Sequence, residues 1–221
     1  MIEGMKKFVL FIITICIAFS ASAQDNARSA MVYKKTKGAT VYKQFKPATI
    51  LLKSGKTISQ PLANIFLKNS SLLYISGENA MEANMNNIIS VDFDDRKYIK
   101  IDSLLYYKVD SVGSDALYKA TVIDMDSYKK NLVNNRNITN IDLGDVISVA
   151  NVDLSNEDDY LFPLISIYYY LYHGDFVRVH ERNLSRVVPK DKQRMMKTCI
   201  GQDSFSWTDE TSLLQLLRMI Q

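Results

Sequence analysis

The segment LISIYYYLYHGDFVRV, residues 164–179, predicts two antiparallel strands joined by a tight turn. Its first part, Leu164 to Tyr172, contains aliphatic and aromatic residues with a single serine and no charge, which is a composition typical of a strand. Gly174 then supplies a residue that tolerates a positive φ, and Phe176 to Val179 is again rich in apolar residues. We therefore expect a hairpin near the end of a β domain.

Similar short segments precede this hairpin and predict an antiparallel sheet. They are rich in Ile, Val, Leu, Tyr and Thr, and several are separated by a turn that contains glycine. In Val91-Asp92-Phe93-Asp94 apolar and acidic residues alternate, as in a strand with one buried and one solvated face. We predict a mainly β fold, either sandwich-like or a partly closed barrel. The other predicted strands are Ala48–Lys53, Thr57–Leu62, Ser71–Ser76, Ile88–Phe93, Tyr98–Ile101, Leu104–Val112, Ala116–Ile123 and Val146–Val149.

After the hairpin the apolar period changes, and two C-terminal α-helices are predicted. Pro189 suits the first turn of a helix that ends before Gly201 and whose apolar face holds Met196, Cys199 and Ile200. The second helix is expected to begin at Thr208 as its N-cap. Its apolar residues repeat at helical spacing and form one stripe, which should pack on the sheet. These residues are Leu213, Leu216, Leu217 and Ile220.

The first 23 residues predict a secretory signal peptide. Lys6 and Lys7 precede a 12-residue apolar run, Phe8 to Phe19, and Ala21-Ser22-Ala23 has the small residues of a cleavage site before Gln24. The run is too short for a transmembrane anchor, which needs about 20 apolar residues. Ile15 stands before Cys16 where a lipoprotein would have a small residue. We expect an exported protein, periplasmic or associated with the cell surface.

Removing residues 1–23 changes the composition on which a functional class depends. The 221 residues have 27 basic and 24 acidic side chains, and the segment takes away two lysines, one glutamate and one of the two cysteines. The remaining chain is nearly neutral, which disfavours a nucleic-acid partner. Its single cysteine, Cys199, excludes an internal disulfide. At 47% hydrophobic and 23% charged residues, the chain has a globular composition.

The predicted organisation has four parts. They are a signal peptide (1–23), an N-terminal arm (24–46), an antiparallel β domain (47–182) and a helical pair that packs on the sheet (183–221). Within them, Gln24 to Lys37 is expected to be mobile. Asn131 to Asn140, with five asparagines, is expected to form a surface loop.

Four segments carry a resemblance to a known group of proteins. After the signal come ATILLKSGKTISQPL (48–62), NNIISVDFDDRKYIKID (86–102), YYYLYHGDFVRVHERNLSRVVPKDKQRMMKTCI (168–200) and DETSLLQLLRMI (209–220). This order resembles small exported β-rich proteins of Bacteroidetes-type bacteria that have no assigned activity. The resemblance implies a cell-envelope location and an Asn-Leu-Ser step into the C-terminal helices, here Asn183-Leu184-Ser185. It implies no catalytic or binding residue.

The sequence predicts no catalytic residue, metal site or cofactor. It contains no G-x-S-x-G, H-E-x-x-H or C-x-x-C motif, and Cys199 lies on the expected buried face of a helix. Carboxylates are dense at Asp92–Asp95, Asp124–Asp126 and Asp153–Asp159, but none has the spacing of a calcium loop. At Asp92–Asp95 we expect a solvated loop with local ion pairs. A pair of carboxylates for glycoside hydrolysis would have to come from separate strands.

Two features could bind a ligand or partner. Arg178 to Lys197 has an excess of five positive charges, led by Arg178, Arg182 and Arg186, and could face an anionic glycan or lipid or form a solvated helix face. Tyr168, Tyr170 and Tyr172 fall on one face of a strand. Those three rings could stack on sugars, or they could pack against the C-terminal helices, which we favour because the helices need an apolar partner.

These observations favour a non-enzymatic binding or assembly module of the cell envelope, whose partner is an envelope protein or an anionic glycan. The alternative is an exported hydrolase whose carboxylates converge from separate strands. A structural subunit is a third possibility, and it would show an exposed apolar patch or an unpaired edge strand. The sequence leaves the ligand, the strand order and the oligomeric state open.

Overall fold

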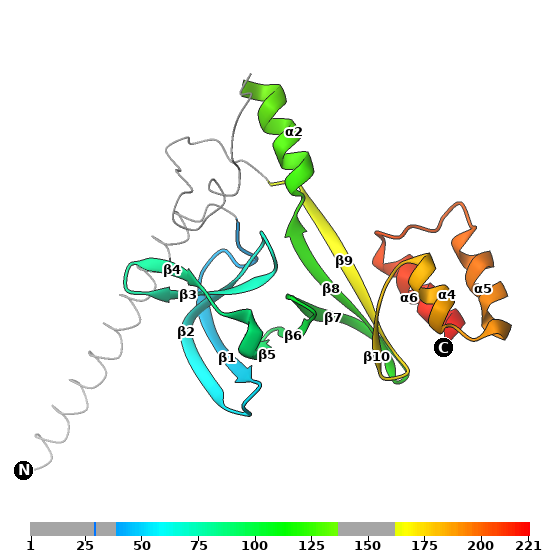
Figure 1. Cartoon of the computed structure of the whole chain (residues 1–221), viewed down its shortest axis with the longest axis horizontal. Helices are drawn as coiled ribbons and strands as arrows, with labels where there is room; N and C mark the ends of the chain where they lie inside the picture. Colours follow the sequence, from blue (N-terminus) through cyan, green and yellow to red (C-terminus); the bar gives the residue numbers. More distant parts are fainter. Residues whose placement is uncertain (1–28, 30–38, 137–161) are drawn as a thin grey trace, which may run out of the picture.

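The computed structural model describes residue 29, residues 39–136 and residues 162–221. This part of the chain is mainly β, with one ten-stranded antiparallel sheet followed by C-terminal helices (Figure 1). The predicted fold class is therefore confirmed, and the sheet is not closed. The strands are β1 (Lys46–Leu52), β2 (Thr57–Phe66), β3 (Ser71–Ser76), β4 (Asn79–Glu82), β5 (Ile88–Asp92), β6 (Lys97–Ile101), β7 (Leu104–Val112), β8 (Asp115–Ile123), β9 (Leu164–Tyr172) and β10 (Asp175–Arg178). The helices are η1 (Met85–Asn87), α2 (Met125–Arg136), α4 (Glu181–Val187), α5 (Lys190–Ile200) and α6 (Glu210–Ile220).

The strand order is β10-β9-β8-β7-β6-β5-β1-β2-β3-β4. Most sequential strands are neighbours, because short turns return the chain beside the strand that it has just formed. The hairpin of β9 and β10 turns at His173 and Gly174, which both have positive φ (50° and 94°), as a two-residue type I′ turn requires. The exception is β5, which returns from β4 to pair with the free edge of β1.

The N-terminal strands curl around their own core. The turn after β2 contacts β7 and β8, since Leu105 N–H donates to Ser70 O (2.9 Å) and Ile123 N–H donates to Leu67 O (2.7 Å). The Ser70 hydroxyl also donates to Leu105 O at 2.6 Å. Apolar residues from β1, β2, β3, β5, β6 and β7 fill the space inside this curl. Of the two predicted architectures, the observed one is closer to the partly closed barrel.

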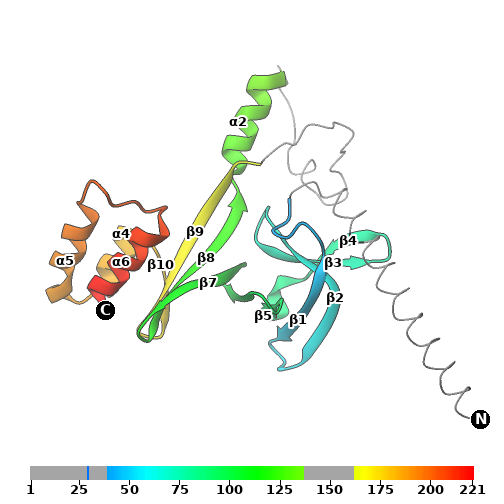
Figure 2. The ribbon, with the colours of Figure 1, turned by 180° about the vertical axis from the view of Figure 1, so that it is seen from behind.

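A second core lies between the C-terminal helices and one face of β7–β10 (Figure 2). The predicted stripe of α6 is confirmed, because Leu213, Leu216, Leu217 and Ile220 are fully buried. Met196 and Cys199 of α5 join them, so the prediction of a buried cysteine is also confirmed. Burial of this many apolar side chains anchors the helices to the sheet, since each contributes roughly 1.5–3 kcal/mol.

Three local predictions need correction. Residues 131–136 belong to helix α2, not to a loop, because Asp124 caps that helix by accepting from the backbone N–H of Asp126 and Ser127. The C-terminal region has a third, short helix, α4, which the apolar period was too brief to reveal. The N-cap of α6 is Asp209 rather than Thr208. Within the predicted arm, Ala39 and Phe45 are buried against the sheet.

Several predictions fall outside the described residues. They concern the signal peptide (1–23), the mobile arm at Gln24–Lys37 apart from Ser29, the strand at Val146–Val149 and the acidic stretch Asp153–Asp159. Among the helices that the structure describes, none is both long enough and apolar enough to cross a membrane.

Candidate functional site

The three tyrosines predicted as binding residues lie in the C-terminal core. Tyr168, Tyr170 and Tyr172 are 5%, 0% and 3% exposed. Their hydroxyl groups donate to backbone carbonyl oxygens at or before α6, which are Thr208 O (3.2 Å), Leu213 O (2.6 Å) and Ile220 O (2.8 Å). The structure thus shows the packing alternative for this row, because the rings are covered by the helices and present no surface to a sugar.

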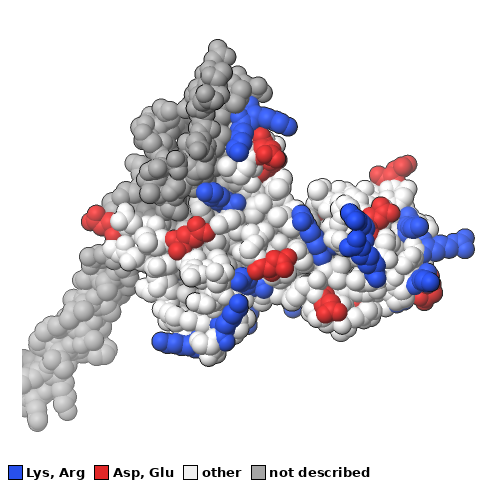
Figure 3. Space-filling model, in the orientation of Figure 1, with Lys and Arg blue, Asp and Glu red and all other residues white. Residues whose placement is uncertain are grey.

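The three arginines predicted with them are exposed but do not converge on the tyrosines. Arg178 lies on β10, beside Tyr169 on the sheet face away from the helices, while Arg182 and Arg186 lie on α4. Lysine and arginine side chains are interspersed with acidic ones over this helical end (Figure 3). The basic segment is therefore spread over separate surfaces of the described structure and does not make one site with the tyrosines.

A different group of residues, which we call the cation–aromatic cluster, is the candidate functional site. It consists of Tyr42, Lys46, Phe93, Asp95, Arg96, Tyr98 and Tyr107. The chain before β1, the start of β1, the turn between β5 and β6, and strands β6 and β7 supply these residues. The cluster lies at the rim of the N-terminal core, to which Phe93 and Tyr98 belong.

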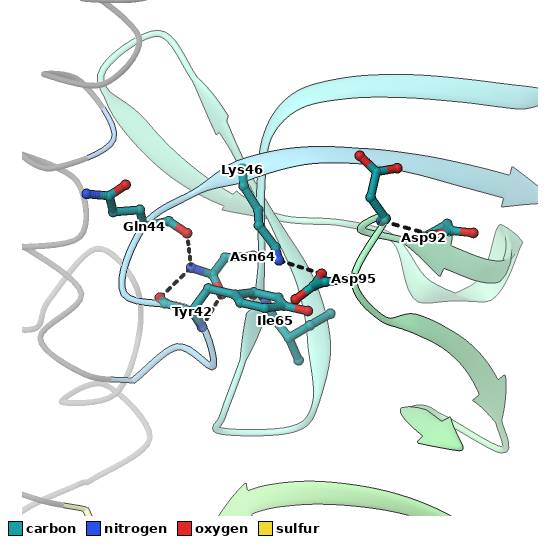
Figure 4. Close-up of polar contacts among 8 residues, drawn as sticks. Tyr42, Gln44, Lys46, Asn64, Ile65, Asp92 and Asp95 are labelled. Carbon is teal, nitrogen blue, oxygen red and sulfur yellow. Dashed lines mark hydrogen bonds and ion pairs between the residues drawn. The ribbon is translucent and has the colours of Figure 1, made fainter. Parts of the chain in front are cut away.

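Two turns of the chain place the members of the cluster. Asn64 of β2 is fully buried, and its side chain accepts from Tyr42 N–H (3.1 Å) and donates to Tyr42 O (2.9 Å), which fixes the backbone of Tyr42 (Figure 4). In the second turn, Asp92 accepts from Asp94 N–H at 3.1 Å, and Asp94 has a positive φ of 66°. This compact turn between β5 and β6 presents Asp95 and Arg96 on its exposed side.

Cations and aromatic rings alternate in the cluster. The Lys46 ammonium lies 3.6 Å from the centroid of the Tyr42 ring and also forms an ion pair with Asp95 at 2.6 Å. The Arg96 guanidinium lies 4.2 Å from the centroid of Tyr107. Ring centroids are 5.0 Å apart for Tyr42 and Phe93, and 5.9 Å apart for Tyr98 and Tyr107. Such contacts hold each cation in one place, at about 0.5–1 kcal/mol where exposed.

The hydroxyl groups of Tyr42 and Tyr98 are buried beneath this layer. Tyr98 is only 2% exposed, and its hydroxyl lies against the Tyr42 hydroxyl and the Arg96 guanidinium, although neither phenol makes a hydrogen bond of normal distance and angle with the described residues. Burial raises the pKa of Tyr42 and the pKa of Tyr98, so both phenols remain protonated and can donate. An unpaired buried polar group costs about 1–3 kcal/mol, and such a group calls for an explanation in a native fold.

The charges of the cluster are unevenly compensated. The ion pairs among the described residues are Lys46–Asp95 and Lys119–Glu210, and Arg96 belongs to neither. Burial opposes the ionised form of Asp95, but the hydrogen bond and charge of Lys46, a backbone hydrogen bond and the charge of Arg96 together outweigh it and hold the pKa of Asp95 below its ordinary value. Arg96 is thus an exposed cation with a fixed position and no carboxylate partner in the described part of the chain. An oxyanion is the complementary group.

A second ion pair, between Lys119 and Glu210, lies between the cation–aromatic cluster and the C-terminal helices. Lys119 of β8 donates to Glu210 of α6 at 2.7 Å, and its ammonium lies 5.9 Å from the Tyr168 ring centroid. Tyr107 connects the cation–aromatic cluster with Lys119. It is opposite Lys119 in the pairing of β7 and β8, and the Arg96 guanidinium lies over its ring. Lys46, Arg96 and Lys119 therefore mark a band of basic side chains that crosses the sheet between the two cores.

Sequence reasoning missed this cluster and interpreted part of it differently. Asp92–Asp95 was expected to form local ion pairs, but Asp95 pairs with Lys46, 49 residues away in sequence. Among the residues that can be described, no group of three or more His, Cys, Asp or Glu side chains could hold a metal ion. The available signal was weak: Phe93-x-x-Arg96-x-Tyr98 places basic and aromatic residues together, but Tyr42 and Tyr107 come from distant segments.

Comparison with known proteins gives no relative from which a function could be inferred. No family model, no curated protein and no solved structure matches the chain.

Proposed function

We propose that this protein is an exported, non-enzymatic binding module of the cell envelope whose ligand is an anionic glycan. The cation–aromatic cluster is the binding site in this proposal. The observation that carries it is Arg96, a positioned guanidinium without a carboxylate partner among the described residues, beside the buried hydroxyls of Tyr42 and Tyr98.

The donors of the cluster favour an anionic ligand. The guanidinium of Arg96 can only donate, and the protonated hydroxyls of Tyr42 and Tyr98 add two further donors. A carboxylate or phosphate offers several acceptor atoms and can take a bidentate contact from arginine. Because the hydroxyls are closed off from solvent, the exposed Arg96 guanidinium is the donor that the ligand's anionic group meets first.

The surroundings favour a glycan over an isolated small anion. Tyr42 and Tyr107 are partly exposed, and their rings offer apolar surface beside Arg96 on which the C–H face of a sugar can rest. Lys46 and Lys119 lie on either side of Arg96 in the band described above. A polymer with repeated acidic groups could compete with Asp95 and Glu210 for these lysines, which adds contacts along the chain of the polymer.

Arg96→Ala should weaken binding of an oligogalacturonide about 10- to 100-fold, because a charge-assisted hydrogen bond is lost. Arg96→Lys should be intermediate, since lysine keeps the charge without the planar fork. Isothermal titration calorimetry measures both variants. The matched control is Arg182→Ala, which removes an exposed arginine on α4 and should leave the affinity unchanged. Equal binding of the methyl-esterified oligogalacturonide, which lacks the charge, would contradict an anionic ligand.

A second variant separates a binding role from a structural one. Tyr98→Phe removes a buried hydroxyl whose contacts with Tyr42 and Arg96 lack normal hydrogen-bond geometry, so the free protein should be as stable as the wild type or more stable. The same variant should bind the oligogalacturonide several-fold more weakly, because one donor to the anion is gone. If Tyr98→Phe destabilises the free protein and leaves binding intact, the hydroxyl has a structural role and the proposed site is wrong.

The charges at the cluster favour binding over the hydrolase alternative. A glycosidase needs one carboxylic acid with a raised pKa as its proton donor. At this site the pKa of Asp95 is lowered, and Glu210 forms an ion pair with Lys119. The oligogalacturonide should therefore be recovered at its original length after incubation. Shortened products that disappear in Asp95→Asn would favour the hydrolase.

The export part of the proposal rests on residues 1–23 and on the resemblance to exported proteins of Bacteroidetes-type bacteria. Lys6, Lys7 and the apolar run to Phe19 are the features that a signal peptidase substrate requires. We expect the protein recovered from the periplasm or cell surface to begin at Gln24. N-terminal sequencing checks this, and an intact Met1 on envelope-associated protein would contradict cleavage.

A further inference from the structure

Among the residues that the structure describes, the outer edge of β9 has no strand beside it over about half of its length. β8 pairs with β9 from Leu164 to Leu171, whereas β10 covers its other side only from Tyr169 to Tyr172, with one more bond from Val179 N–H to Tyr168 O at 2.9 Å. Within residues 39–136 and 162–221, no strand pairs with Leu164–Ile167 on that side. Figures 1 and 2 both show this part of β9 without a neighbouring strand on the side of β10.

The alternation of backbone groups shows which residues face outward at this edge. In an antiparallel strand, successive residues direct their N–H and C=O groups to opposite sides. Because Tyr168 O accepts a bond from the β10 side, the backbone groups of Ser166 and Leu164 point to that same side. In the described part of the chain, no strand takes their N–H and C=O groups.

Among the described residues, three strand edges have no neighbouring strand: β4, β10 and the Leu164–Ile167 part of β9. Their charges favour the β9 edge as the one that pairs with another chain. The two ends of the sheet carry charged residues, Glu82 on β4 and Asp175 and Arg178 on β10, which is a common protection against edge-to-edge pairing. Leu164–Ile167 has no charged residue. In addition, Leu164 and Ile165 are 51% and 45% exposed and lie on opposite faces of the strand, so apolar surface flanks the free backbone groups on both sides.

We infer that this edge pairs with the same edge of a second copy of the chain, around a twofold axis at Ile165. The segment is complementary to itself. Antiparallel pairing places Leu164 opposite Ser166 of the second copy, and the backbone N–H and C=O groups of both residues then face each other and can form hydrogen bonds. Ile165 then meets Ile165 of the second copy on the axis. No like charges meet, because the segment is uncharged, and the result is one continuous sheet across the dimer.

The test uses two variants with opposite charges at the axis. Ile165→Lys and Ile165→Glu each place like charges directly opposite one another, so each variant alone should be monomeric at concentrations where the wild type is dimeric, a loss of at least tenfold in dimer affinity. An equimolar mixture should recover the dimer, because lysine then faces glutamate. Sedimentation velocity measures all three samples. Recovery in the mixture also shows that both variants are folded.

A cross-link tests the register independently. Opposed residues at a non-hydrogen-bonded antiparallel position lie about 4.5 Å apart between Cα atoms, within reach of a disulfide. Ile165→Cys should therefore give an oxidised dimer on a non-reducing gel, while Phe176→Cys, an equally exposed position on β10, should not. Cys199 is buried and does not compete. A monomeric wild type at high micromolar concentration, or equal cross-linking of both variants, would overturn the inference. Arg96→Ala should weaken glycan binding without changing the dimer affinity, so the proposed dimer and the proposed glycan site can be disproved independently of each other.

Discussion

Tyr170→Ala should lower the free energy of unfolding by about 3–5 kcal/mol, the largest effect that we expect from a single substitution in this protein. Tyr170 is fully buried between the sheet and the C-terminal helices. Truncation to alanine removes the ring and leaves a cavity that Leu117, Leu213 and Leu217 cannot fill without moving. Urea denaturation followed by circular dichroism measures the change.

Tyr170→Phe separates the ring from its hydroxyl. The hydroxyl donates to Leu213 O at 2.6 Å, and burial raises the pKa of Tyr170, so it remains a neutral donor. Phenylalanine keeps the ring, so Tyr170→Phe should lower the free energy of unfolding by only about 1 kcal/mol. Phe176→Ala serves as the matched control, because that aromatic residue is 43% exposed on the adjoining strand and should cost less than either. If Tyr170→Ala and Phe176→Ala cost the same, the helices do not pack on the sheet as described.

Asn64→Ala should lower the free energy of unfolding by about 2–4 kcal/mol, the second largest effect that we expect. The Asn64 side chain is fully buried and accepts from Tyr42 N–H, while its amide donates to Tyr42 O and, at 3.4 Å, to Gln44 O (Figure 4). Alanine leaves these backbone groups without their partner, and each unpaired buried group costs about 1–3 kcal/mol. Denaturant unfolding measures the loss, with Asn79→Ala on the exposed edge strand β4 as the neutral control.

Asn64→Ala should also weaken ligand binding, because Asn64 positions Tyr42 and does not itself belong to the cation–aromatic cluster. We expect the affinity for the oligogalacturonide to fall under conditions where the variant is still folded, and added ligand should raise its melting temperature less than it raises that of the wild type. A variant that is destabilised but binds with unchanged affinity would show that Tyr42 contributes nothing to the site. An undisturbed stability would show that the contacts of Asn64 do not form.

The sequence predicted much of the fold because local patterns were strong. The uncharged run Leu164–Tyr172 with the turn at His173-Gly174 forms the expected hairpin, and the stripe of α6 is buried as its spacing indicated. Patterns failed where they were short or where a cap decided the structure. Helix α4 has only seven residues, and α2 forms in an asparagine-rich segment because Asp124 satisfies its first backbone donors.

The candidate site could not be predicted in the same way. Tyr42, Arg96 and Tyr107 belong to separate segments, and they meet because β5 returns to pair with β1 and because Asn64 fixes the chain before β1. The predicted row of Tyr168, Tyr170 and Tyr172 was read correctly as one face of a strand. Sequence alone favoured packing on the C-terminal helices over sugar binding, and the structure shows the packing.

The sequence by itself determined most of the strands, the turns between them and the apolar stripe of the last helix, because these depend on residues that are neighbours along the chain, whereas the short strand β4 (Asn79–Glu82) was not predicted. The tertiary structure alone decided the strand order, the burial of the tyrosine row and the assembly of the cation–aromatic cluster. It also decided that, within the described residues, no strand covers the outer edge at Leu164–Ile167. The physical reason is that hydrophobic periodicity specifies which face of an element is buried, whereas the partner of that face depends on long-range pairing that no local pattern encodes.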